Sequence, residues 1–186
     1  MSRVRPLWRS LVDAAVFLAL CFLVVLALQI YNGEKIDQGS VTVIDGDSLR
    51  EGKTEIRLYG IDAPEYRQSC ADQNGVSYAC GKRAADELRQ LLRTGQTTCK
   101  SFEIDRYGRS VATCQSGALN LNSEMVRRGW AVAFVQFGVD YVLIEKEARA
   151  AKRGLWAGKF EEPATYRKRM RPMQSDAVGV NDWQPD

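Results

Sequence analysis

The stretch that decides the fold spans residues 57–65 and reads Arg57-Leu58-Tyr59-Gly60-Ile61-Asp62-Ala63-Pro64-Glu65. Leu58 and Ile61 suit a β-strand, whereas Pro64 cannot continue a central strand because it lacks the backbone N–H. Asp62 and Glu65 are therefore expected where a strand becomes a loop. The stretch brings one cation and two carboxylates to the end of a predicted strand.

Two other short motifs carry the same types of side chain. Upstream, an apolar run closes on the triplet Asp45-Gly46-Asp47. Downstream, a predicted hairpin turn reads Asp105-Arg106-Tyr107-Gly108-Arg109. Carboxylates can gather a hard cation, and a guanidinium can fork two hydrogen bonds onto a phosphate. The three motifs together contain the groups needed to cleave a phosphodiester.

In their order and approximate spacing, these motifs resemble the thermonuclease (staphylococcal nuclease-like) family, and the resemblance covers about residues 41–156. It implies a five-stranded OB-type Greek-key β-barrel with about three helices. It also implies a calcium-dependent nuclease that hydrolyses phosphodiester bonds in DNA and RNA with low sequence specificity. The expected cofactor is therefore Ca²⁺.

The residue patterns by themselves predict only an α+β domain. Strands are predicted over residues 41–44, 48–50, 55–61, 97–104 and 109–114. Helices are predicted over residues 82–93, 121–128 and 141–153. Apolar residues at helical spacing and glycines at the expected ends support the helices.

The resemblance assigns the metal ligands to Asp47, Asp62 and the backbone carbonyl of Ala63. Hard cations such as calcium prefer carboxylate and carbonyl oxygens, and a carbonyl ligand does not depend on the side chain. The alternative is that the triplet is merely a turn, since Asp-Gly is a common turn signal. Asp45 is expected to serve that turn.

The resemblance makes Glu65 the general base and Arg57 and Arg109 the two catalytic, phosphate-binding arginines. A guanidinium stays charged and can stabilise the charge that builds on a transferring phosphoryl group. Taken without the motif, Glu65 could be a surface glutamate. Arg57 could equally be an outward-facing residue of an alternating strand.

Substrate contacts are expected from Arg106, Tyr107, Phe134 and Phe137. The type member of the family has tyrosine hydroxyls near the nucleotide, where this chain has the two phenylalanines. Phenylalanine rings can stack on bases but cannot hydrogen-bond a phosphate. The alternative for the phenylalanines is simple core packing.

The chain has five cysteines and no histidine. The lack of histidine excludes His general bases, His nucleophiles and His-ligated zinc. Cys99 and Cys114 flank a predicted hairpin turn symmetrically, and Cys70 and Cys80 share one loop, so the pairs Cys70–Cys80 and Cys99–Cys114 are predicted as disulfides. Reduced thiols at all four positions are the alternative.

The N-terminal region suggests a membrane anchor, because no charge interrupts residues 14–30 and arginines precede them. At ~1.5 Å per residue this run approaches the thickness of a bilayer core. The positive-inside rule places the N-terminus in the cytoplasm and the catalytic domain on the periplasmic or extracellular side of the inner (cytoplasmic) membrane. A cleaved signal peptide is the alternative.

The expected organisation divides the chain into five parts. They are a basic cytoplasmic N-terminus (1–10), a single transmembrane signal anchor (11–30), a linker (31–38), a thermonuclease-like domain (39–160) and a basic, then flexible, tail (161–186). The expected partners are DNA and RNA substrates and the membrane, and no protein partner is predicted. The rival hypothesis is a non-catalytic OB-type module that binds nucleic acid or protein.

Overall fold

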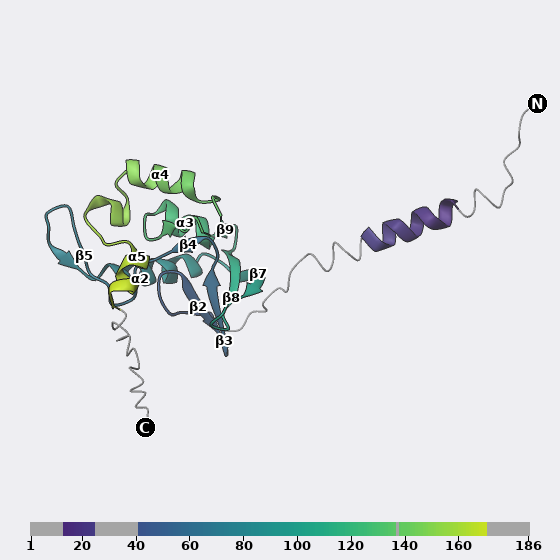
Figure 1. Cartoon of the computed structure of the whole chain (residues 1–186), viewed down its shortest axis with the longest axis horizontal. Coiled ribbons are helices and arrows are strands. Elements are labelled where there is room, and N and C mark those ends of the chain that lie inside the picture. The colour runs from purple at the N-terminus through teal and green to yellow at the C-terminus, as the bar shows by residue number, and fades with distance from the viewer. Residues whose placement is uncertain (1–12, 25–40, 137, 171–186) are drawn as a thin grey trace, which may run out of the picture.

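The computed structural model describes residues 13–24, 41–136 and 138–170. Residues 13–24 form a helix, which Figure 1 shows in purple. Within the described ranges, no helix is both long and apolar enough to cross a membrane. The predicted anchor over residues 11–30 lies only partly within these ranges.

The main sheet has six strands in the order β1-β2-β3-β8-β7, with β9 added to β8. Its strands are β1 (Val41–Val43), β2 (Ser48–Glu51), β3 (Thr54–Leu58), β7 (Thr97–Ile104), β8 (Ser110–Ser116) and β9 (Leu119–Asn120). All neighbours are antiparallel except β3 and β8, which run parallel. This mixed sheet with helices confirms the predicted α+β class and is consistent with an OB-like fold, but it has six strands where five were predicted, because the short β9 adds to β8.

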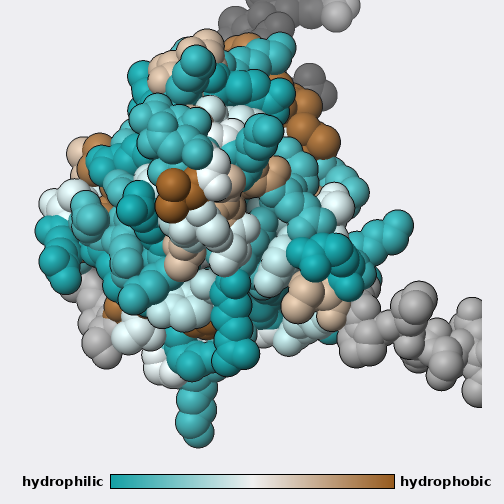
Figure 2. Space-filling view, turned by 90° about the vertical axis from the view of Figure 1, so that its left-hand side faces the viewer, coloured by the Kyte–Doolittle hydropathy of each residue, from teal (hydrophilic) through white to brown (hydrophobic). Residues whose placement is uncertain are grey.

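Two small sheets complete the strands of the described chain. β4 (Ile61–Asp62) pairs with β10 (Val132–Ala133), and β5 (Cys70–Ala71) pairs with β6 (Ser77–Tyr78). The side of the domain that carries the β5–β6 hairpin is mainly hydrophilic, with small separate hydrophobic spots (Figure 2). This face is therefore suited to solvent.

The alternation of side chains along β3 directs one arginine away from the core. Ile56 and Leu58 are fully buried against the other apolar residues of the sheet and helices. Successive strand residues point to opposite faces. Arg57, between them, therefore faces the opposite side, which is where the site lies.

Helices gather beside the main sheet (Figure 1). They are α2 (Cys80–Leu92), α3 (Leu121–Arg127), α4 (Val142–Ala150), the 3₁₀ turn η1 (Gly154–Ala157) and α5 (Pro163–Met170). The buried face of α2 consists largely of the apolar residues that its spacing predicts. At the start of α3, the side chain of Asn120 accepts a hydrogen bond from the N–H of Ser123 at 2.9 Å. The three predicted helices are thus confirmed, with ends that differ by a few residues.

The C-terminal region contains a helix that the sequence patterns do not predict. Residues 161–186 are predicted as a basic, then flexible, tail. Pro163–Met170 within this range is a helix, and residues 171–186 lie outside the described residues. Proline suits the first turn of a helix because its missing N–H is not needed there. The helix has no continuous apolar stripe, and Pro163 is its buried residue. For that reason its sequence gives little sign that it docks on the domain.

Both predicted disulfides are present. Cys70 bonds to Cys80, ten residues away, and Cys99 bonds to Cys114, fifteen residues away. Cys99 and Cys114 are directly paired residues of the β7–β8 ladder. The remaining cysteine, Cys21, is free and exposed.

Each disulfide should stabilise the fold by an amount that rises slowly with the length of the loop it closes. Replacing Cys99 and Cys114 together with alanine should lower the free energy of unfolding by about 3 kcal/mol, because a fifteen-residue loop regains its entropy in the unfolded chain. The Cys70/Cys80 double variant should lose slightly less free energy of unfolding. Cys21→Ala should leave the free energy of unfolding unchanged. Urea unfolding under non-reducing conditions measures this, and equal stability of all variants would contradict it.

Candidate active site

The two aspartates predicted as metal ligands lie together below the surface. Asp47 is 2% exposed and Asp62 is 1% exposed. Asp47 Oδ2 accepts a hydrogen bond from the N–H of Ala63 at 2.6 Å, which joins the turn after β1 to the end of β4. Ser48 donates its hydroxyl to Asp47 Oδ1 at 3.0 Å. The distant motifs therefore meet through a backbone contact.

This contact requires glycine at position 46. A Cβ at Gly46 would lie 2.6 Å from the Cβ of Ala63 and 2.8 Å from that of Ala84, closer than real side chains approach. The neighbouring Asp45 serves the turn as predicted, because its Oδ1 accepts from the N–H of Asp47 at 3.1 Å. Burial raises the pKa of Asp45, partly offset by a hydrogen bond from Ser48.

Arg57 bridges the two buried aspartates. Its guanidinium forms an ion pair with Asp47 Oδ1 and donates to Asp62 Oδ1 at 2.8 Å and to the carbonyl of Ile61 at 3.1 Å. Burial lowers the pKa of Arg57, and the charge of Asp62 opposes that change. The reading of Arg57 as a solvent-facing strand residue is therefore wrong. It lies inside the site.

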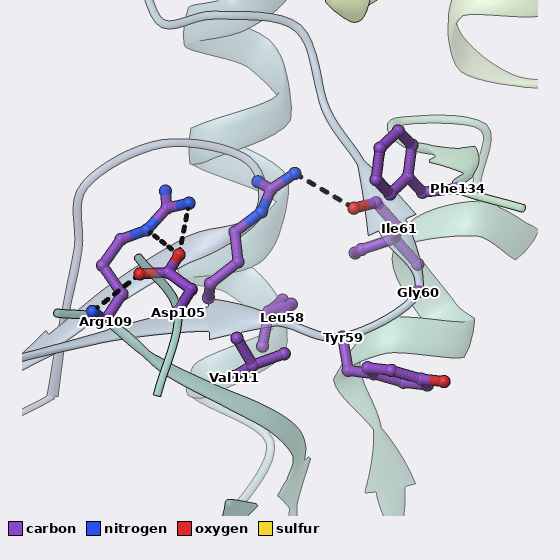
Figure 3. Close-up of a pocket in the computed structure, with 9 residues that line it drawn as sticks. Leu58, Tyr59, Gly60, Ile61, Asp105, Arg109, Val111 and Phe134 are labelled. Atoms are coloured by element: carbon purple, nitrogen blue, oxygen red, sulfur yellow. Dashed lines mark hydrogen bonds and ion pairs between the residues drawn. The ribbon is translucent and has the colours of Figure 1, made fainter. Parts of the chain in front are cut away.

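Arg109 is held by the carboxylate that begins its own hairpin turn. Asp105 Oδ2 accepts from Nε and from Nη2 of Arg109, both at 2.8 Å (Figure 3). Asp105 Oδ1 accepts from the N–H groups of Tyr107 at 2.9 Å and Arg109 at 3.0 Å. Burial alone would raise the pKa of Asp105, but these hydrogen bonds from Arg109 and Tyr107 lower it overall.

A cavity of about 50 Å³ brings the two predicted catalytic arginines to one place. Arg57 and Arg109 both line it, and Figure 3 shows Phe134 across the pocket from the Asp105–Arg109 pair. The N–H of Phe134 is fixed by the carbonyl of Gly60 at 2.9 Å. A ring beside two guanidinium groups suits a base next to its phosphate.

The other predicted substrate residues lie at the rim or outside the described ranges. Tyr107 is 62% exposed, and the guanidinium carbons of Arg106 and Arg109 lie 4.9 Å and 5.4 Å from its ring centre. Arg106 is exposed. Phe137 lies outside the residues that the structure describes.

Glu65 lies in the loop after β4. Its N–H donates to Oε1 of Gln68 at 3.2 Å, and its side chain is 36% exposed. Its carboxylate does not line the cavity between the arginines. Instead, Glu65 Oε1 accepts from Nη1 of Arg167 at 2.9 Å.

Arg167 is the site residue that the sequence did not reveal. It comes from α5, and its Nη1 and Nη2 donate to Asp62 Oδ1 at 2.9 Å and Oδ2 at 2.8 Å. Burial would lower the pKa of Arg167, but hydrogen bonds to Asp62 and Glu65 raise it overall. The only sequence signal for this residue was the basic cluster over residues 167–171. Such a cluster is as typical of a solvated tail as of a helix that contacts a site.

The donor atoms fit a hard cation. Asp47 and Asp62 present oxygen ligands, and both contact the guanidinium of Arg57, so their carboxylates lie close together. Within the described chain, no three His, Cys, Asp or Glu side chains form a metal cluster by themselves. Calcium takes about 6–8 oxygen ligands, so a carbonyl, water and phosphate would have to complete the set.

Comparison with known proteins identifies the family of the chain. Residues 55–158 match the family described as staphylococcal nuclease homologue. The chain therefore belongs to the staphylococcal nuclease homologue family, and it is a nuclease of the hydrolase class.

Individual relatives match about two thirds of the chain. A "Micrococcal nuclease" of Shigella flexneri is 30% identical over 146 residues, which are 69% of this chain and 78% of that protein. An "Uncharacterized endonuclease" of Escherichia coli O157:H7 is 35% identical over 124 residues, 63% of this chain and 74% of that protein. A "Succinoglycan biosynthesis protein ExoI" of Rhizobium meliloti is 32% identical over 132 residues, 69% of each chain.

A substitution of Asp105 tests whether its hydrogen bonds from the Arg109 side chain position that arginine. Asp105→Asn keeps an oxygen for the turn but loses the charge that holds the Arg109 guanidinium. We expect a folded protein whose kcat/KM on DNA falls about tenfold, the equivalent of one weakened charge-assisted hydrogen bond.

Asp72→Asn is the matched control. Asp72 Oδ1 accepts from the N–H groups of Asn74 at 2.8 Å and Val76 at 2.9 Å, so it serves a similar turn. Its substitution should leave the rate unchanged. Equal rates for both variants would show that Arg109 does not need its carboxylate.

Proposed function

We propose that this chain is a membrane-anchored, calcium-dependent nuclease that hydrolyses phosphodiester bonds in DNA and RNA with low sequence specificity. The observation that carries the proposal is the convergence of Asp47 and Asp62 on Arg57, which lines one cavity together with Arg109. Buried carboxylates next to phosphate-binding guanidinium groups are what metal-assisted phosphodiester cleavage requires.

Each side chain has a distinct task in this proposal. Arg57 and Arg109 bind the phosphate and stabilise the charge that builds on it during displacement. Glu65 takes a proton from the attacking water. Asp47 and Asp62, with the carbonyl of Ala63, hold the cation, which when bound supplies positive charge for the phosphate oxygens.

Low sequence specificity follows from the kind of contacts available. The substrate residues are guanidinium groups for phosphate and the rings of Tyr107 and Phe134, with Arg106 and Phe137 nearby in sequence. Ring stacking tolerates any base because every base has a π-face. The names "Micrococcal nuclease" and "Uncharacterized endonuclease" of the relatives support nucleic acid as the substrate.

Cleavage assays with defined variants test the proposal. Purified protein should cut both DNA and RNA with calcium, and a calcium chelator should stop the reaction. Arg57→Ala, Arg109→Ala and Glu65→Gln should each lower kcat by at least about a hundredfold. Single arginines in other phosphoryl-transfer enzymes contribute about 10³–10⁵-fold.

Arg50→Ala is the control, because Arg50 lies on the adjacent strand β2 and pairs with Glu55 in an exposed ion pair at 2.5 Å. Such pairs contribute little to stability, and Arg50 does not line the cavity. The kcat of the Arg50→Ala variant should therefore equal that of wild type. The proposal would be contradicted if the Arg57→Ala and Arg109→Ala proteins fold and keep the wild-type kcat. Nucleic-acid binding without any cleavage would favour the non-catalytic module.

The membrane location rests on the uncharged run over residues 14–30 and the arginines that precede it. We expect the N-terminus in the cytoplasm and the nuclease domain outside the inner membrane, where disulfides persist. A reporter that works only in an oxidising compartment, fused after Asp186, should be active. Activity of a cytoplasmic reporter alone at that position would contradict this topology.

A further inference from the structure

Helix α5 is delivered to the site by a segment beyond the family match, which ends at residue 158. Lys159 and Ala71 exchange two backbone hydrogen bonds, both 2.8 Å long. This pairing aligns the segment with the β5–β6 hairpin, which the Cys70–Cys80 disulfide ties to the start of α2. The path of the chain into α5 is therefore fixed by ordered contacts.

A buried glutamine couples this segment to the loop of the general base. Gln68 is 0% exposed, and its Nε2 donates to the carbonyl of Glu161 at 2.7 Å. Its Oε1 accepts from the N–H of Glu65 at 3.2 Å. One side chain thus sets the distance between Glu65 and the start of α5, where Pro163 is also buried.

The Arg167 side chain of α5 binds the carboxylates that the cation needs. Arg167 donates to both oxygens of Asp62 and to Glu65 Oε1, with distances of 2.8–2.9 Å. Arg57 also donates to Asp62 Oδ1 at 2.8 Å. Both oxygens of Asp62 are thus already bound by a guanidinium. A divalent cation uses the same lone pairs and is repelled by the same positive charge.

We propose that α5 is a built-in competitor for the cation site, and that Arg167 must leave Asp62 and Glu65 before a divalent cation binds there. This inference rests on the calcium-dependent function proposed above. Arg167 acts as a gate rather than as a catalytic residue. The helix that carries it is eight residues long and exposes most of its surface, so it can move without opening the core.

Calcium titration of the full chain without nucleic acid tests the gate. Arg167→Gln should bind calcium at least about tenfold more tightly than wild type, because three charge-assisted hydrogen bonds no longer have to be broken. Calorimetry with calcium chloride gives the dissociation constants directly.

Arg169→Gln is the matched control. Arg169 lies on the same helix and pairs with Glu161 at 2.9 Å, so its substitution removes the same charge without touching Asp62. Its calcium affinity should stay within about twofold of wild type, since an exposed charge is screened by salt. Equal tightening by both variants would mean that only net charge matters, which overturns the gate.

Hydrogen exchange of the wild-type protein provides a second measurement that does not depend on a variant folding. Calcium should speed exchange of the α5 amides, such as the N–H of Tyr166 that bonds to the carbonyl of Glu162 at 2.9 Å. Calcium binding to wild type and Arg167→Gln with equal affinity, or unchanged exchange in α5, would overturn the gate alone. Failure of both proteins to bind calcium would overturn the proposed cofactor as well.

Discussion

The buried carboxylate of Asp62 is the group on which the rest of the site depends. It is 1% exposed, and a buried charge is tolerated only when it is paired and hydrogen-bonded. Arg57 from β3 and Arg167 from α5 supply that pairing. The strand, the loop of Glu65 and the C-terminal helix are thereby held around a single negative charge.

A second constraint is steric and brings the other aspartate to this charge. The turn before β2 can approach β4 only because position 46 has no side chain, and Asp47 then reaches the N–H of Ala63. Two disulfides hold the surrounding hairpins, one across β7–β8 and one from β5 to α2. Rigid elements therefore present the charged groups, which suits a site that must be organised before substrate arrives.

The core and the C-terminal segment contribute differently to the site. Residues 55–158 match the nuclease family and contain Arg57, Asp62, Glu65 and Arg109. Arg167 lies beyond that match and places a positive charge on two of these acidic groups. The carboxylates that would hold the proposed cation also attract this arginine, because both carry positive charge.

The sequence by itself determined the α+β class, the main strands and helices, both disulfides and the meeting of Asp47, Arg57 and Asp62. These features follow from local patterns and from linked motifs whose residue types already match one chemistry. Tertiary structure alone decided the place of Arg167, which contacts Asp62 across 105 positions. Such a contact has no local signature, because the sequence of a basic, mostly exposed helix resembles that of a solvated tail. Only the contacts of Gln68 and of the β5–β6 hairpin show that the helix is directed to the site.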